Sequence, residues 1–191
     1  MWLGQVYPGG TEIEISLIFA DVRGSSKLAE SMSPAEFSRL MNRFYETASR
    51  IFIRTDAFID KMVGDEIIGL YIPGYAGPRH ARKALVAAQR LGQAMGYGSV
   101  DGPWLPIGVG VHTGTVFVGT VQGADGAATD FTALGDNVNI AARLAENAEP
   151  GHALVSDATC KLAGLNLDNF DHRRLNLRGM SEPIGVHDYS F

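Results

Sequence analysis

The sequence predicts an α+β fold, an α/β sandwich in which helices cover one antiparallel-rich sheet. Three observations lead to this class. Strand and helix signals alternate in the order β-α-β-β-α-β-β-α, the connections are short, and no internal repeat or low-complexity tract interrupts them. With 191 residues, 46% of them hydrophobic, the chain can bury the core of one domain. We therefore expect a lead-in, residues 1–12, and a single domain, residues 13–191.

The first strand and the first long helix have clear limits. Apolar residues predict a strand over 13–22 that ends beside an acidic residue. Ser33, Pro34 and Glu36 predict a helix start, with a serine cap, a proline at the first helical position and a glutamate at the third. Apolar residues spaced three and four apart continue this helix for roughly five turns, through Phe52.

The remaining elements follow in order along the chain. Gly64-Asp65 is suited to a hairpin turn between two short strands. Thr113-Gly114 predicts a hinge between two later strands. The predicted elements are strands at 57–62 and 66–72, a helix at about 78–95, strands at 103–112 and 115–121, a polar loop at 122–129, a helix from Gly135 to Ala148, short strands near Ala153, Leu175 and Ile184, and a short helix at 157–163.

Composition excludes several classes of protein. The net charge of −5 and the pI near 5.5 argue against nucleic-acid binding, which needs a clustered basic face. The single cysteine, Cys160, cannot form an internal disulfide and favours a reducing compartment. No apolar run approaches the roughly 20 residues of a membrane-spanning helix, and no signal peptide is recognisable. We expect a cytoplasmic protein.

Two aspartates are candidates for a metal site. Asp21 ends an apolar strand, and Asp65 lies on the hairpin turn. If the strand adjoins the hairpin, the two carboxylates meet, and such a pair can hold two Mg²⁺ ions about 3.5–4 Å apart for in-line phosphoryl displacement. Taken singly, each residue has a simpler explanation: Asp21 ends a strand, and Asp65 supplies turn geometry.

A polar face on the helix after Gly135 is a second candidate. Asn139 and Arg143 are four residues apart and share one face near the positive helix end, where an amide and a guanidinium suit a ribose and a phosphate. A solvent-facing polar stripe is the simpler alternative. The sequence contains no P-loop, no dinucleotide-binding glycine spacing and no nucleophile elbow, and none of its five histidines has the spacing of a local metal pair.

Four segments in this order and spacing strongly resemble the class III adenylyl and guanylyl cyclase catalytic domain. They are Phe19-Ala20-Asp21-Val22-Arg23-Gly24, Lys61-Met62-Val63-Gly64-Asp65, residues 108–114 and residues 131–144. The resemblance covers the chain from about Ile13 onward. It implies that residues 13–191 are a cyclase catalytic domain with a ferredoxin-like βαββαβ core and additional strands, the nucleotide cyclase fold. It also implies a head-to-tail homodimer with active sites at the interface.

The resemblance assigns the metal and base contacts residue by residue. Asp21 and Asp65 of one subunit would bind two Mg²⁺ or Mn²⁺ ions, with help from the Val22 carbonyl. Lys61 of the other subunit would contact the adenine ring, and Thr132 would accept from its amino group. Guanylyl relatives usually place glutamate and a small residue at these two positions, so the resemblance favours ATP as the substrate.

Three further residues complete the implied site. Asn139 would orient the ribose, and Arg143 would stabilise charge on the α-phosphate in the transition state. Arg178, in Leu177-Arg178-Gly179, stands in the late phosphate-binding segment, where lysine is usual. The implied reaction converts ATP to 3′,5′-cyclic AMP and pyrophosphate without a covalent intermediate. Any regulatory domain would lie outside this chain.

The sequence departs from the family pattern at two places. Many relatives carry an aromatic residue after Arg-Gly, where this chain has Ser25. Many bacterial relatives carry an arginine shortly before the threonine, where this chain has Ala127-Ala128. The second departure favours one alternative to the adenylate cyclase, a catalytically silent nucleotide-binding regulatory module. A guanylate cyclase is a further alternative that stays open.

Overall fold

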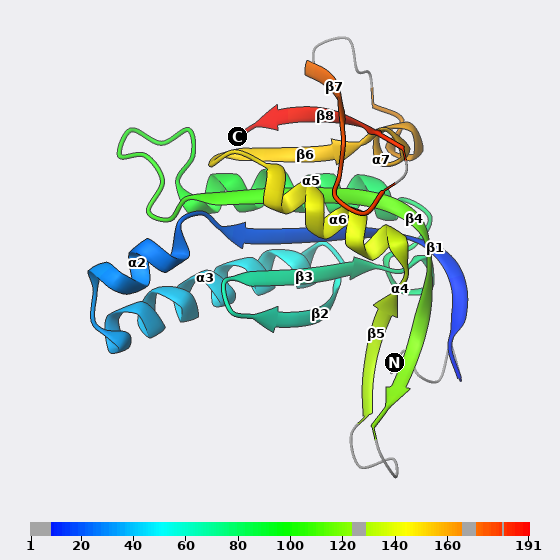
Figure 1. Ribbon diagram of the computed structural model, residues 1–191, viewed down its shortest axis with the longest axis horizontal. Helices are drawn as coiled ribbons and strands as arrows, with labels where there is room; N and C mark the ends of the chain where they lie inside the picture. Colours follow the sequence, from blue (N-terminus) through cyan, green and yellow to red (C-terminus); the bar gives the residue numbers. More distant parts are fainter. Residues whose placement is uncertain (1–8, 124–128, 166–170, 181) are drawn as a thin grey trace.

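The computed structural model describes residues 9–123, 129–165, 171–180 and 182–191 (Figure 1). Within this part of the chain no helix is long and apolar enough to cross a membrane. The elements are β1 (Thr11–Val22), α2 (Ser25–Ser31), α3 (Pro34–Arg54), β2 (Phe58–Val63), β3 (Glu66–Tyr71), α4 (Pro73–Ala76), α5 (His80–Met95), β4 (Ile107–Gln122), β5 (Thr129–Leu134), α6 (Asp136–Asn147), β6 (His152–Ser156), α7 (Asp157–Ala163), β7 (Asp171–Leu175) and β8 (Ile184–Ser190).

These strands form one eight-stranded mixed sheet, which confirms the predicted α+β class. Their order is β2-β3-β1-β4-β6-β8-β7, with β5 paired to β4 outside this path. The order β2-β3-β1-β4, with α3 and α5 as the connecting helices, is the expected ferredoxin-like βαββαβ core. Strands β4 and β6 run parallel, and the other pairs are antiparallel.

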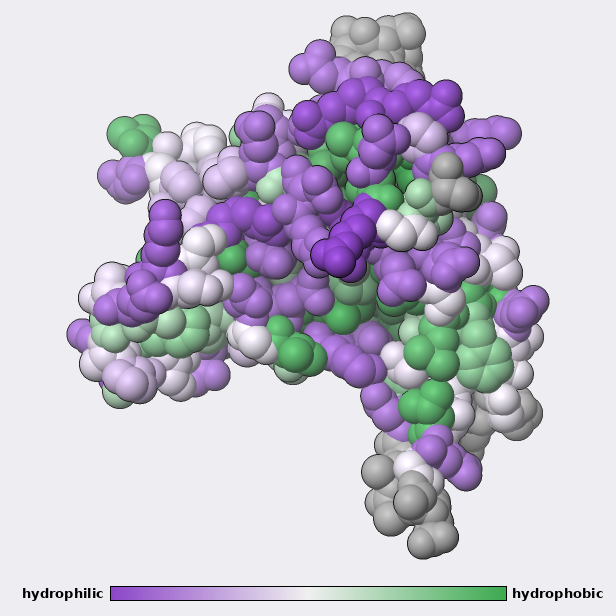
Figure 2. Space-filling model, in the orientation of Figure 1, coloured by the Kyte–Doolittle hydropathy of each residue, from purple (hydrophilic) through white to green (hydrophobic). Residues whose placement is uncertain are grey.

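The β4–β5 pair projects from the sheet as an arm (Figure 1). Figure 2 shows apolar residues, in green, on the surface of this arm. Leu134, at the end of β5, keeps 48% of its surface exposed. Met62 and Val63, on β2, are exposed to a similar degree. Single exposed apolar side chains are common on protein surfaces, whereas a contiguous patch of them marks an interaction surface.

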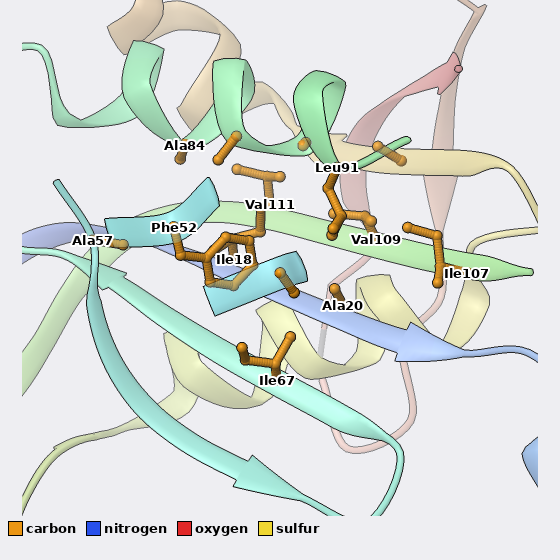
Figure 3. Close-up of a cluster of buried hydrophobic side chains, with 14 of the residues drawn as sticks. Ile18, Ala20, Phe52, Ala57, Ile67, Ala84, Leu91, Ile107, Val109 and Val111 are labelled. Carbon is orange, nitrogen blue, oxygen red and sulfur yellow. The ribbon is translucent and has the colours of Figure 1, made fainter. Parts of the chain in front are cut away.

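Strand β1 is buried on both faces, which explains its nearly continuous apolar sequence. Ile18, Ala20 and Val22 face a core that α3 and α5 cover, with Phe52 and Leu91 contributed by the helices (Figure 3). The alternate residues Ile15, Leu17 and Phe19 face a second core, which Ala141 and Ala145 of α6 close. Because side chains alternate along a strand, Asp21 lies on the α6 face.

The start of α3 is as predicted. The Ser33 hydroxyl accepts a hydrogen bond from the Glu36 backbone N–H at 3.3 Å, and the Glu36 carboxylate accepts one from the Ser33 N–H at 2.9 Å. Pro34 occupies the first helical position. This capping box satisfies donors that the helix itself leaves unpaired. The short helices α2 and α4 were not predicted, because their few residues show no helical periodicity.

The predicted hinge at Thr113-Gly114 is wrong, because β4 runs without a break from Ile107 to Gln122. In the β1–β4 ladder Thr113 lies opposite Ser16 and Gly114 opposite Ile15. The glycine is required by packing rather than by a turn. A Cβ on Gly114 would lie 2.4 Å from the side chain of Asn137 on α6. The polar loop predicted at 122–129 mostly lies outside the described residues.

Candidate active site

The end of β1 and the β2–β3 turn adjoin, as the two-aspartate hypothesis requires. The backbone N–H of Val22 donates to the carbonyl of Asp65 at 3.0 Å. Asp21 lies opposite Glu66 in the β1–β3 ladder. Burial, partly offset by Arg23 and reinforced by the negative charges of Asp65 and Glu146, raises the pKa of Asp21 to about 6. The structure therefore brings Asp21 and Asp65 into electrostatic contact.

Ser25 holds the second aspartate of this pair. Its hydroxyl donates a short hydrogen bond to Oδ2 of Asp65. Ser25 begins α2, which follows β1 after a two-residue turn. The serine that departs from the family pattern therefore orients a carboxylate of the candidate metal site, a contact that a phenylalanine side chain, which has no donor, could not make.

Arg23 connects the acidic end of β1 to α6. Its guanidinium forms an ion pair with Asp21 at 3.0 Å and donates to the backbone carbonyls of Ala145 at 2.8 Å and Glu146 at 2.9 Å. Those carbonyls lie in the last turn of α6, where a helix attracts positive charge. Arg23 thus fixes the distance between Asp21 and the helix that carries Asn139 and Arg143.

Glu66 is an acidic neighbour that the sequence reasoning missed. Burial and the charges of Asp21 and Asp65 raise the pKa of Glu66 to about 7. The three carboxylates of Asp21, Asp65 and Glu66 carry more negative charge than the single guanidinium of Arg23 can balance. The ends of β1 and β3 therefore have excess negative charge. Carboxylate oxygens in such an arrangement suit hard divalent cations such as Mg²⁺. Glu66 directly follows Asp65, and this adjacency was the available signal.

Lys61 and Thr132 also come together, on the β2 side of the sheet. The Lys61 ammonium donates to the Thr132 hydroxyl at 3.0 Å and to the Asp130 carboxylate at 2.8 Å. Partial burial lowers the pKa of Lys61, but the hydrogen bond to Asp130 and the charge of Asp60 outweigh it, and the pKa is raised. Lys61 is therefore a cation held next to the Thr132 hydroxyl.

Asp60 is a second residue that the sequence reasoning missed. Its Oδ2 accepts from the Thr132 hydroxyl at 3.2 Å, and the Lys61 ammonium lies 3.6 Å from it. Neighbours along a regular strand point to opposite faces, but the β2–β3 register shifts between Ile59 and Lys61. This bulge allows Asp60 and Lys61 to reach the same hydroxyl. Oδ1 of Asp60 is buried without a partner among the described residues.

The N-terminal end of α6 is fixed by a buried histidine. Nε2 of His112 donates to Oδ1 of Asn137 at 2.8 Å, and Nδ2 of Asn137 donates to the Thr115 carbonyl at 2.7 Å. Burial lowers the pKa of His112, which favours the neutral ring. A Cβ on Gly110 would lie 2.4 Å from Ala141 O, so α6 also packs directly on the β4 backbone. His112 is a structural residue, as its apolar strand indicates.

The α6 residues of the expected site point to solvent or to their own helix. Asn139 is exposed, and Arg143 donates to Glu146 at 2.6 Å. Arg178 is exposed between β7 and β8. In the described part of the chain, no hydrogen bond or ion pair joins Lys61 or Thr132 to Asp21 or Asp65. The structure therefore holds two separate groups, one acidic and one around Lys61. Ala127-Ala128 lies outside the described residues.

We expect Glu66→Gln to stabilise the metal-free protein at pH 8 but not at pH 4. The folded-state pKa of Glu66, about 7, exceeds its ordinary value of 4.5, so the folded protein keeps a proton that the unfolded chain loses. The free energy of unfolding therefore falls as the pH rises from about 4.5 to about 7, and above pH 7 the ionised Glu66 destabilises the folded protein in full. Melting temperatures in a chelating buffer measure the difference.

Replacement of the exposed Glu30 on α2, Glu30→Gln, provides the control, because it removes the same charge at a residue that does not contribute to the pKa shifts of Asp21 or Glu66. A Glu66→Gln melting temperature that matches wild type at both pH values would contradict the electrostatic coupling of Glu66 to Asp21. Divalent ions should reduce the pH 8 difference, since a bound cation stabilises the ionised carboxylates.

Comparison with known proteins identifies the family to which the chain belongs. The profile of the family described as the adenylate and guanylate cyclase catalytic domain matches residues 10–186. An adenylate cyclase of Anabaena cylindrica is 32% identical over 136 residues, which are 68% of this chain and 26% of that protein. Adenylate cyclase 1 of Rhizobium meliloti is 29% identical over 136 residues, 69% of this chain and 20% of that protein. The chain thus spans about a quarter of the length of these relatives or less.

Two solved structures share the fold over nearly the whole chain. The adenylyl cyclase CyaB from P. aeruginosa superposes with a TM-score of 0.80 at 26% identity, covering 94% of each chain. The guanylyl cyclase Cya2 superposes with a TM-score of 0.79 at 24% identity, covering 94% of this chain and 93% of that one. Because the family profile covers nearly all of the sequence, the chain belongs to the adenylate and guanylate cyclase catalytic domain family, the class III nucleotide cyclases.

Proposed function

We propose that this domain is an adenylate cyclase that converts ATP to 3′,5′-cyclic AMP and pyrophosphate with two divalent ions at a homodimer interface. The observation that carries the proposal is the contact between the end of β1 and the β2–β3 turn, which brings Asp21 and Asp65 together. Two partly desolvated carboxylates side by side cost free energy. A strand end and a turn do not require that cost, whereas a cation site does.

The proposed chemistry is an in-line displacement at the α-phosphorus. The ribose 3′-oxygen forms a bond to phosphorus, and the bond to pyrophosphate breaks. When held by Asp21, Asp65 and the Val22 carbonyl, Mg²⁺ or Mn²⁺ supplies acidity to the 3′-hydroxyl and neutralises triphosphate charge. Asn139 orients the ribose, and Arg143 donates to the developing charge at phosphorus.

The contacts of Thr132 support adenine as the base. Its hydroxyl proton points to the Asp60 carboxylate, and its oxygen accepts from Lys61. The remaining lone pair can only accept, which matches the amino group of adenine, whereas guanine presents a carbonyl acceptor at the corresponding position. Lys61 donates, and adenine N1 accepts. Asp60 thus determines the hydrogen-bonding direction of Thr132, and we infer that it determines base preference through Thr132.

Separation of the two groups supports a shared site between two subunits. Asp21 and Asp65 lie at one end of β1, and Lys61 contacts the β5 residues Asp130 and Thr132. Head-to-tail pairing would bring the acidic group of one subunit to Lys61 and Arg143 of the other. The exposed apolar residues of the β4–β5 arm (Figure 2) offer surface for this pairing.

The purified chain should form cyclic AMP from ATP in the presence of Mn²⁺. Asp65→Ala and Arg143→Ala should each lower the rate by roughly a hundredfold or more, since each removes charge stabilisation made in the transition state. An equimolar mixture of the two variants should recover part of the activity, because one hybrid site of the mixed dimer keeps both functional halves. Product chromatography measures the rates.

Far-UV circular dichroism and sedimentation must show that both variants fold and mix. Absence of product at high protein concentration would favour the silent regulatory module, and faster turnover of GTP would favour a guanylate cyclase. If mixed dimers form but the mixture is inactive, the shared site is contradicted, while the assignment of cyclase activity is not. Asp21→Ala tests the other metal ligand in the same assay, and near-normal activity of that variant would contradict the two-metal site.

Asp60→Asn should weaken the preference for ATP over GTP. The asparagine amide can donate to Thr132, which turns the hydroxyl proton outward and makes Thr132 a donor for the guanine carbonyl. We expect the ratio of kcat/KM for ATP to that for GTP to fall by about two- to tenfold, the range of one hydrogen bond.

Asp130→Asn is the matched control, because Asp130 binds Lys61 at 2.8 Å and makes no hydrogen bond to Thr132 among the described contacts. An unchanged ratio in Asp60→Asn, or an equal fall in both variants, would show that Asp60 does not act through Thr132.

A further inference from the structure

Three potential metal ligands meet at the far edge of the sheet, away from Asp21 and Asp65. Asp157 is the first residue of α7, His172 lies on β7 and His187 on β8. Nε2 of His187 is 3.1 Å from Oδ1 of Asp157, and Nε2 of His172 is 3.2 Å from the same oxygen. All three ligand atoms lie within 4.8 Å of one another. In the sheet, β4 and β6 separate β8 from β1.

The fold builds this cluster from three distant segments. His172 and His187 are direct partners in the β7–β8 ladder, and their ring centroids are 4.7 Å apart. Asp157 follows β6 directly and begins α7, whose Ser156 cap fixes the first turn. Gly185 leaves space for the carboxylate, because a Cβ there would lie 2.0 Å from Oδ2 of Asp157. The glycine lets Asp157 approach the strand that carries His187.

The distances from Asp157 to the two histidines fit a tetrahedral metal site. Ligands about 2.0–2.1 Å from a Zn²⁺ ion lie about 3.3 Å from one another. The nitrogen–oxygen separations in the cluster are 3.1–3.3 Å. Exposed fractions of 48% for the His172 side chain and 53% for Asp157 leave a fourth position open to water, whereas His187, at 7%, anchors the inner side. Imidazole ligands favour transition-metal ions over Mg²⁺.

We propose that Asp157, His172 and His187 bind one divalent transition-metal ion, with Zn²⁺ as the best fit, at a site separate from the cyclase centre. The ion would join the start of α7 to the β7–β8 pair and so fasten the edge of the sheet. His187 also lines a cavity of about 280 Å³, and its Nδ1 is buried without a hydrogen-bond partner among the described residues.

A neighbouring histidine–carboxylate pair provides the contrast. His152 lies 2.7 Å from Asp188, and that carboxylate also pairs with Arg173 at 3.0 Å. The negative charge of Asp188 is therefore balanced by the guanidinium of Arg173, which is always cationic. Among the described residues the ion-pair partners of Asp157 are histidines only, which are cationic only when protonated. This difference makes His152→Ala the matched control.

The test measures Zn²⁺ binding to the full chain by titration calorimetry. The chain carries Asp65→Ala, is stripped with a chelator and is kept in excess Mg²⁺, so that the cyclase centre does not contribute. We expect one Zn²⁺ per chain and a higher melting temperature. His172→Ala, His187→Ala and Gly185→Ala should each weaken binding by at least about tenfold, the loss seen even for outer-shell partners. His152→Ala should bind as the parent does.

Gly185→Ala keeps every ligand and only displaces the Asp157 carboxylate, so its weaker binding would identify geometry rather than misfolding as the cause. Co²⁺ in place of Zn²⁺ should give the strong visible absorption of a tetrahedral site. No saturable Zn²⁺ binding, or equal binding by the parent and the three cluster variants, would overturn the proposal. The test measures Zn²⁺ binding and not cyclase activity, so neither result supports or contradicts the proposed cyclase function.

Discussion

Strand β1 is hydrogen-bonded along both edges, and the register of these two ladders determines where Asp21 lies in the candidate site. Asp21 stands opposite Glu66 on one side and Gly108 on the other. A shift of one residue would move Asp21 from the α6 face to the face of α3 and α5. The two buried cores prevent such a shift, because it would exchange Ile18 and Phe19 between cores of different shape.

Glycines set the second constraint, the distance between α6 and the sheet. Gly110 and Gly114 let the helix and its Asn137 side chain approach β4 more closely than any other residue would. The sequence around Thr113-Gly114 resembles a turn, and the predicted hinge followed from that local pattern. The glycine is instead required by packing between residues that lie more than twenty positions apart, which local patterns do not record.

The sequence could predict the fold class and the capping box of α3, because strand alternation and turn chemistry are local. It offered the contact between the end of β1 and the β2–β3 turn only as a condition, because that contact joins residues more than forty positions apart. It could not predict Asp60 beside Thr132, since this depends on a bulge within β2. Ser25 replaces the aromatic residue that many relatives carry, and its hydroxyl donates to Asp65, a contact that the sequence did not indicate. The Asp157 cluster has no spacing motif, because its two histidines meet only through the β7–β8 ladder and Asp157 reaches them from the start of α7.

The central claim is that Asp21 and Asp65 form one cation site. Anomalous diffraction from crystals grown with Mn²⁺ and a non-cyclising ATP analogue tests it most directly. The account predicts manganese peaks between these two carboxylates, with the triphosphate of the analogue bound to them. Peaks confined to other residues, or a triphosphate bound away from the end of β1, would contradict it.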